Sequence, residues 1–193
     1  MIISSYDVGG IVDAANQFRD WKFIVTEDNK GDTEILKLLE SDPLYSFAEW
    51  PIPTLPNVAA GIYAIWKETE FVYVGIAGHG WSETKIAKMR EEGERNKGLR
   101  QRLQSHRNGR RGGDQFCLYV FDRFVLPNLS PEQISAAASG VGIMDQLTQE
   151  FIQSQLTYRF VEVIDGLTAL RIERLIRSGR FNAGKPLLNP MEL

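Results

Sequence analysis

Residues 61–75 read GIYAIWKETEFVYVG and decide the fold of this 193-residue chain. Two short runs of aromatic and branched apolar residues, 61–66 and 71–75, flank the polar residues 67–70. Such a pattern is typical of a β-hairpin. The loop length sets the register. A three-residue loop over 67–69 would place Tyr63 directly opposite Tyr73 on one sheet face, whereas a four-residue loop would send the two hydroxyl groups to opposite faces.

Further elements are expected on both sides of this hairpin. Upstream, the sequence predicts a helix over 12–18, a strand over 21–26, a helix over 33–39 and an extended, proline-rich connector over 43–58. Downstream, it predicts helices over 82–96, 99–107, 131–137, 144–155 and 167–177, and strands over 115–122 and 158–165. Strands and helices alternate without the long apolar runs of a parallel sheet, which favours an α+β fold built on an antiparallel sheet.

The composition is that of a folded domain, with 43% hydrophobic and 24% charged residues. A single cysteine, Cys117, excludes an intrachain disulfide and a cysteine-based zinc site, and only two histidines argue against a transition-metal site. No basic leader precedes an apolar run, and no stretch of about 18 apolar residues occurs. We therefore expect a cytoplasmic protein that does not contact a membrane.

Charge is distributed unevenly along the chain, although the formal net charge is only -3. Residues 1–55 carry ten acidic and four basic residues, whereas residues 95–113 carry no acid at all. The bases of this second stretch are Arg95, Lys97, Arg100, Arg102, Arg107, Arg110 and Arg111. Runs of this kind are commonly solvated surfaces, but a local basic cluster can also bind a polyanion.

Two predicted helices carry charged residues beside apolar ones. In residues 99–107, Arg102 and His106 share a helical face with two leucines. A buried guanidinium needs an anion, which could be a core carboxylate or a bound phosphate. Glu173 lies at the edge of the apolar stripe of its helix, where it could pair with Arg177 or bind a hard cation such as Mg²⁺. Tyr63 and Tyr73 could serve packing alone.

These residues together resemble the signature of the GIY-YIG nuclease family. The triplet at 61–63, followed by the triplet at 73–75, is similar to the pair that gives the family its name. Residues 98–106 resemble the family's arginine helix, 169–173 its glutamate helix and 186–189 its closing asparagine motif. All five elements occur in family order over about residues 60–189.

The resemblance implies a small three-stranded antiparallel sheet flanked by helices, and a phosphodiester hydrolase that uses one divalent metal, Mg²⁺ or Mn²⁺. The roles that it implies are general base or water positioning for Tyr63, second active-site tyrosine for Tyr73, catalytic arginine for Arg102, metal ligand for Glu173 and supporting asparagine for Asn189. His106 matches a position where the family often has histidine.

The chain also departs from the family's simple plan. Twenty-three residues separate Gly75 from Leu99, and they include the loop histidine His79, which could touch substrate or be an ordinary loop residue. Two candidate strands, 115–122 and 158–165, lie between the catalytic helices. We assign 158–165 as the third strand of the core because it directly precedes the Glu173 helix, so the other strand and its helices would be an insertion. Residues 1–58 would form an acidic extension and connector, and 59–193 the nuclease domain.

The expected function is a metal-dependent DNA endonuclease. In this hypothesis, Arg100, Arg107, Arg110 and Arg111 contact phosphates. The alternative is a non-cleaving nucleic-acid-binding module in which the acidic N-terminal region mediates protein contact or autoinhibition. The biological role, the preferred substrate and the oligomeric state stay open. Concerted cleavage of both strands would require a dimer.

Overall fold

The structure is a computed structural model that describes residues 29–189. The helix expected over 12–18 and the strand expected over 21–26 lie outside these residues. Three long antiparallel strands form the sheet: β2 (Val58–Lys67), β3 (Glu70–Ala77) and β5 (Leu156–Val163), with β2 in the centre. The short β1 (Tyr45–Ser46) extends the β5 edge, and β4 (Lys97–Gly98) pairs with the start of β2. The predicted α+β fold with an antiparallel sheet is confirmed.

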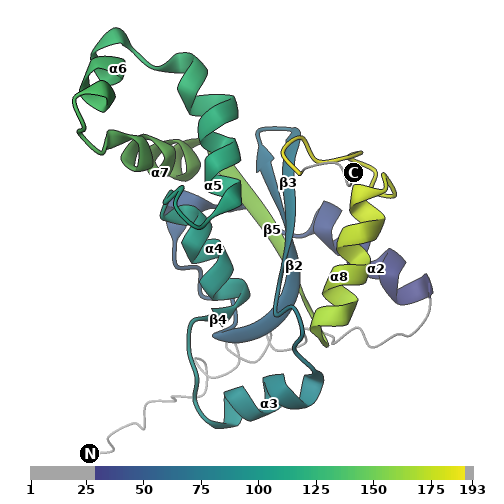
Figure 1. Ribbon diagram of the computed structural model, residues 1–193. Helices are drawn as coiled ribbons and strands as arrows, with labels where there is room; N and C mark the ends of the chain where they lie inside the picture. The colour runs from purple at the N-terminus through teal and green to yellow at the C-terminus, as the bar shows by residue number, and fades with distance from the viewer. Residues whose placement is uncertain (1–28, 190–193) are drawn as a thin grey trace, which may run out of the picture.

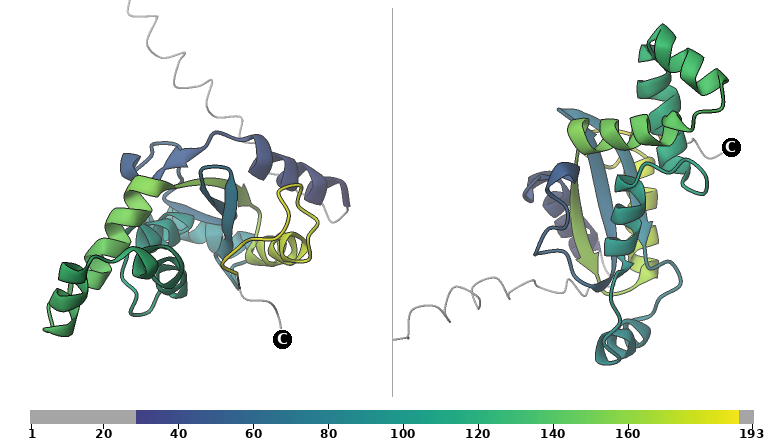
Figure 2. Two further views of the ribbon diagram at one scale, coloured as in Figure 1. Left: turned by 90° about the horizontal axis from the view of Figure 1, so that it is seen from above. Right: turned by 90° about the vertical axis from the view of Figure 1, so that its left-hand side faces the viewer.

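Helices cover both faces of this sheet (Figure 1). One face packs against α2 (Asn29–Ser41), α3 (Glu83–Glu91) and α8 (Gly166–Arg177). The other packs against α4 (Leu99–Arg107), α5 (Gln115–Val120) and α7 (Ile143–Gln155). Beyond the sheet, α6 (Pro131–Ala138) projects from the body of the protein (Figure 2). No helix in residues 29–189 combines the length and apolar character needed to cross a bilayer.

The hairpin places both tyrosines on one face by a route that neither predicted loop describes. Lys67 pairs with Glu70, so the loop has only two residues, and a bulge between Ile65 and Trp66 shifts the register beyond it. Tyr73 therefore pairs with Ile65, two positions from Tyr63 on the same face. The two tyrosines are diagonal neighbours, and without the bulge they would lie on opposite faces.

The strand predicted over 115–122 is wrong, because these residues form α5, which continues into a π-helical turn over Phe121–Val125. Asp114 caps the helix, as its side chain accepts a hydrogen bond from the backbone N–H of Phe116. The apolar residues that resemble a strand follow a helical spacing toward the core, where Phe116, Cys117 and Val120 are buried. The assignment of β5 as the third strand of the core is confirmed.

The described part of residues 1–58 is integral to the fold and not an appendage. Helix α2 buries Ile35 and Leu39 in the core beside α8, and the connector buries Phe47, Ile52 and Leu55 in the core beside α4. Residues 29–58 therefore contribute to the same core clusters as the rest of the described chain. The apolar side chains of the connector explain this, since their burial against the sheet removes them from water.

Candidate functional site

Tyr63 lies at the centre of the candidate site, fully buried between β3 and α4. Its ring crosses the backbone of Gly75, its pairing partner on β3. A Cβ atom at position 75 would lie 2.3 Å from the Tyr63 hydroxyl oxygen, so a side chain here would displace the ring. Gly75 is thus required at the end of the second triplet because a side chain there would occupy the space of the Tyr63 hydroxyl.

Helix α4 lies close against β2 because Gly61 has no side chain. A Cβ atom at position 61 would lie 2.4 Å from a methyl carbon of Leu99, which is fully buried together with Leu103. The polar residues on this inner face are Arg102 and His106, as the helical spacing predicts. The His106 Nε2 atom lies 2.8 Å from the Tyr63 hydroxyl. The Arg102 guanidinium lies near enough to Tyr63 for its charge to oppose the rise in the pKa of that phenol.

Asp114 completes this constellation, and it was not among the site residues expected from the sequence. Its Oδ2 atom lies 2.7 Å from His106 Nδ1, while its Oδ1 atom accepts the Phe116 N–H at 3.1 Å. His106 is fully buried and Asp114 is only 6% exposed. The one signal in the sequence was an aspartate directly before an apolar helical run, which predicts a helix cap and gives no indication of an imidazole partner.

Tyr73 lies beside both Tyr63 and His106, and Glu173 lies near Tyr73. The Tyr73 ring lies 6.4 Å from the Tyr63 ring and packs edge-on against His106, with 5.9 Å between ring centroids. Helix α8 packs against β3 and carries Glu173 toward Tyr73. The pKa of Tyr73 is raised mainly by burial, and the nearby Glu173 charge adds to this rise. Glu173 is partly exposed. The structure thus brings Tyr63, Tyr73, Arg102, His106 and Glu173 together.

The buried setting fixes the charge states of the central groups. Burial, reinforced by Tyr73, holds the pKa of Tyr63 well above its usual value, although Arg102 opposes this shift. Burial also lowers the pKa of His106, against the hydrogen bond and charge of Asp114. Burial alone would raise the pKa of Asp114, but His106 and Arg102 outweigh it and hold that pKa below its usual range. At neutral pH the groups are a phenol, a neutral imidazole and a carboxylate.

Asn189 acts on the outer edge of β3 and not inside the site. Its side-chain oxygen accepts the Val74 N–H, and its side-chain nitrogen donates to the Val74 carbonyl, both at 2.8 Å. The backbone N–H groups of Leu187 and Leu188 bond to the carbonyls of Phe71 and Val72. The chain end therefore pairs with the edge of the strand that carries Tyr73, which is a supporting role.

Three of the four arginines expected to bind phosphates are held by other parts of the protein. Arg100 donates to the connector carbonyls of Ile52, Leu55 and Pro56, and Arg107 donates to the Phe47 carbonyl at 3.0 Å. The Arg111 Nε atom lies 2.8 Å from an Asp145 carboxylate oxygen. Arg110 is exposed to solvent. These contacts give Arg100, Arg107 and Arg111 a structural role, and substrate contact by any of the four stays a prediction.

The predicted metal position fits a hard cation in its donor chemistry. Mg²⁺ and Mn²⁺ bind through one or two carboxylates and keep several waters, as a partly exposed carboxylate beside a tyrosine allows. His106, Asp114 and Cys117 also cluster within 4.8 Å. Both ring nitrogens of His106 are hydrogen bonded, the Cys117 thiol donates to the His106 carbonyl at 3.4 Å, and burial raises the thiol pKa. This trio is a hydrogen-bonded network, not a thiolate metal site.

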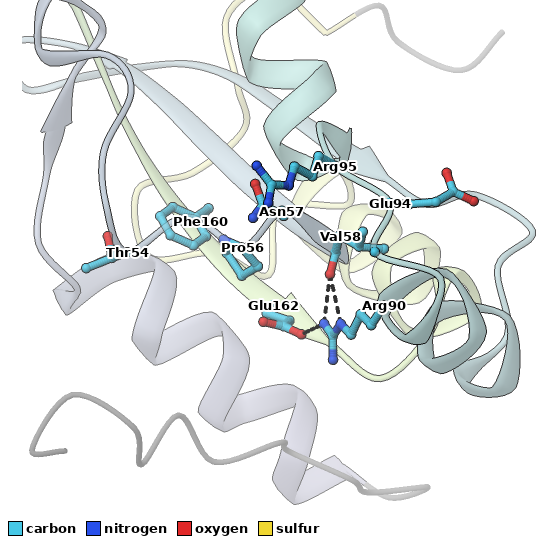
Figure 3. Close-up of a pocket in the computed structure, with 10 residues that line it drawn as sticks. Thr54, Pro56, Asn57, Val58, Arg90, Glu94, Arg95, Phe160 and Glu162 are labelled. Carbon is cyan, nitrogen blue, oxygen red and sulfur yellow. Dashed lines mark hydrogen bonds and ion pairs between the residues drawn. The ribbon is translucent and has the colours of Figure 1, made fainter. Parts of the chain in front are cut away.

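Two hollows differ in their relation to this site. One of about 350 Å³ is lined by Arg102 together with His79, Trp81, Gln101 and Ser105, and no carboxylate lines it. The other, of about 930 Å³, lies between α3 and β5 (Figure 3). There Arg90 bonds to the Val58 carbonyl and pairs with Glu162. The first hollow adjoins the catalytic candidates, whereas the second shares no residue with them.

No protein-family model, curated protein or solved structure matches this chain. The functional interpretation therefore depends on the geometry of the site itself.

Proposed function

We propose that this protein hydrolyses phosphodiester bonds of nucleic acid, with DNA as the substrate, and that it uses one divalent metal ion. The observation that carries the proposal is the hydrogen bond between Tyr63 and a neutral, buried His106, with the Arg102 guanidinium beside the same hydroxyl. A base, a cation and a carboxylate within one site are the groups that an attack on a phosphate diester requires.

Arg102 stabilises charge in this mechanism. It lies near the Tyr63 phenol, where its charge opposes the rise in pKa, and it also lines the hollow beside α4. A guanidinium binds phosphate oxygens through paired hydrogen bonds. Bound to the phosphate, Arg102 stabilises the negative charge of the transition state.

Tyr63 activates the attacking water because its own proton has an acceptor. As the water oxygen forms its bond to phosphorus, one water proton passes to the Tyr63 oxygen and the Tyr63 proton passes to His106 Nε2. The bond from phosphorus to the leaving oxygen breaks, and solvent protonates that oxygen. His106 returns its proton to solvent through Tyr63. Tyr63 therefore does not have to be deprotonated before the reaction, which agrees with its raised pKa.

Glu173 is the proposed ligand for Mg²⁺ or Mn²⁺. Bound there, the ion would supply positive charge to the phosphate and leaving oxygens. Tyr73 neighbours both Tyr63 and Glu173, and its proposed role is to orient the substrate. A base, an arginine and a metal ligand together are the groups that in-line displacement at phosphorus uses.

Cleavage of supercoiled plasmid tests the proposal. Wild type should nick the plasmid in Mg²⁺ or Mn²⁺ and not in EDTA, and Glu173→Ala should lose this activity. Glu162→Ala, on β5 beside Arg90, is a matched carboxylate control and should cleave like wild type. Salt-sensitive DNA binding by wild type without cleavage in either metal would reject hydrolysis and select the binding-module alternative.

A further inference from the structure

The buried carboxylate of Asp114 has two acceptor oxygens, and both are used. Oδ1 accepts the backbone N–H of Phe116, and Oδ2 faces Nδ1 of His106 at 2.7 Å. An ionised carboxylate can only accept hydrogen bonds, so Nδ1 of His106 must carry the proton in this contact. In a neutral imidazole the other nitrogen, Nε2, is then an acceptor. The Tyr63 hydroxyl, 2.8 Å away, consequently donates to Nε2.

We infer that Asp114 is a positioning residue that holds His106 in the tautomer able to accept the Tyr63 proton; this inference rests on the proposed hydrolysis. Asp114 does not touch the substrate and is not protonated during the step. When the Tyr63 proton moves to Nε2, the imidazolium that forms lies between the Asp114 carboxylate and the Tyr63 oxygen, which is receiving the water proton. The carboxylate stabilises that cation and lowers the barrier to proton transfer.

Other groups around His106 do not supply this function. Tyr63 on β2, Tyr73 on β3 and Phe116 on α5 are its aromatic neighbours, and Arg102 adds a positive charge that opposes protonation. The Cys117 thiol donates to the backbone carbonyl of His106 and not to a ring nitrogen. Among the described residues that face the imidazole, Asp114 is the group that favours the protonated ring, and it reaches Nδ1 directly.

The substitution Asp114→Asn separates positioning from simple helix capping. The Phe116 N–H can only donate, so the asparagine oxygen would remain on it as a cap, and the asparagine NH₂ group would face His106 Nδ1. Nδ1 would then be the acceptor and Nε2 the donor, which is the tautomer unable to take the Tyr63 proton. A matched control is Asp165→Asn, because Asp165 caps α8 through the Thr168 N–H without an imidazole partner.

The experiment combines imidazole ¹⁵N NMR with plasmid nicking on the full chain. With only two histidines, the spectrum can be assigned from a His79→Gln variant. Wild type and Asp165→Asn should carry the His106 proton on Nδ1 and cleave equally. Asp114→Asn should carry it on Nε2 and cleave about 10²–10⁴-fold more slowly.

The outcomes separate this inference from the proposed function. A cleaving wild type with the proton on Nε2, or an Asp114→Asn variant that keeps both the wild-type tautomer and rate, overturns the role of Asp114 alone. If Asp114→Asn does not fold, the wild-type tautomer still decides the question. If the wild-type tautomer is as inferred but DNA is not cleaved, the hydrolysis fails, and the catalytic role of Asp114 is overturned with it.

Discussion

Tyr63 and Tyr158 form a matched pair for measuring what the buried hydrogen bond contributes. Both rings are fully buried, and both lie in the core beside α4. The Tyr63 hydroxyl bonds to His106 Nε2 at 2.8 Å, whereas the Tyr158 hydroxyl is buried without a hydrogen-bond partner among the described residues. Replacing each tyrosine by phenylalanine removes one oxygen and leaves the ring in place, so the pair isolates the bond from the packing.

The two substitutions should differ in their effect on the free energy of unfolding. Tyr63→Phe leaves the buried Nε2 acceptor of His106 without a partner, which should lower the unfolding free energy by about 1–3 kcal/mol. Tyr158→Phe removes a hydroxyl that loses its water on folding and gains no bond, so it should be neutral or stabilise the protein by roughly 1 kcal/mol. Tyr63→Phe should also abolish nicking, and Tyr158→Phe should retain it.

Urea unfolding followed by tryptophan fluorescence measures both variants, since the chain has four tryptophans. The slope of free energy against urea should match wild type in each case, so that the midpoints report stability directly. Equal destabilisation by the two substitutions would mean that packing, and not the bond to His106, sets the cost. Full nicking activity in Tyr63→Phe would refute the proton transfer from Tyr63.

Three further predictions concern the support of the site. Gly75→Ala should displace the Tyr63 hydroxyl and reduce nicking at least about 10²-fold, whereas Gly112→Ala, where a Cβ meets nothing within 4 Å, should not. Asn189→Ala loses two hydrogen bonds to β3 and should cost about 1–3 kcal/mol in urea unfolding, with faster amide exchange along that strand. Because the folded-state pKa of His106 is lowered, its contribution to stability is present above the unfolded value of 6.5 and is lost as pH falls from that value through the lower folded-state pKa. Urea midpoints between pH 7.5 and 5.5 should fall less in His106→Gln than in wild type.

The sequence was sufficient to predict the elements whose apolar spacing is regular. Helix α4 has the bounds expected from its leucines, and α6 begins at Pro131, where the helix over 131–137 was expected to begin. The shared face of Tyr63 and Tyr73 could not be derived from the loop length, because it results from a bulge. Local bulges depend on packing across the whole sheet, which a pairing rule for two strands does not contain.

Asp114 escaped prediction for a different reason. It follows a glycine-rich turn, and the positive φ angles of Gly109 (67°) and Gly113 (95°) allow the chain to bring the aspartate back to a histidine eight residues earlier. A helix pattern predicts contacts three or four residues apart and gives no distance across such a turn. The same turn led to the wrong strand over 115–122, since the helix cap at Asp114 was not identified.

Two arginines of α4 give the basic stretch over residues 95–113 a partly structural role. Arg100 and Arg107 bind carbonyls of the connector over residues 47–56, so part of the charge expected on the DNA side instead attaches the upstream chain to the helix. Buried Leu99 and Leu103 attach the same helix to β2. The helix is thus held on both sides, while Arg102 reaches the open hollow. A helix held in this way keeps the Arg102 guanidinium near the buried His106, which would limit the reorganisation that the proposed catalysis needs.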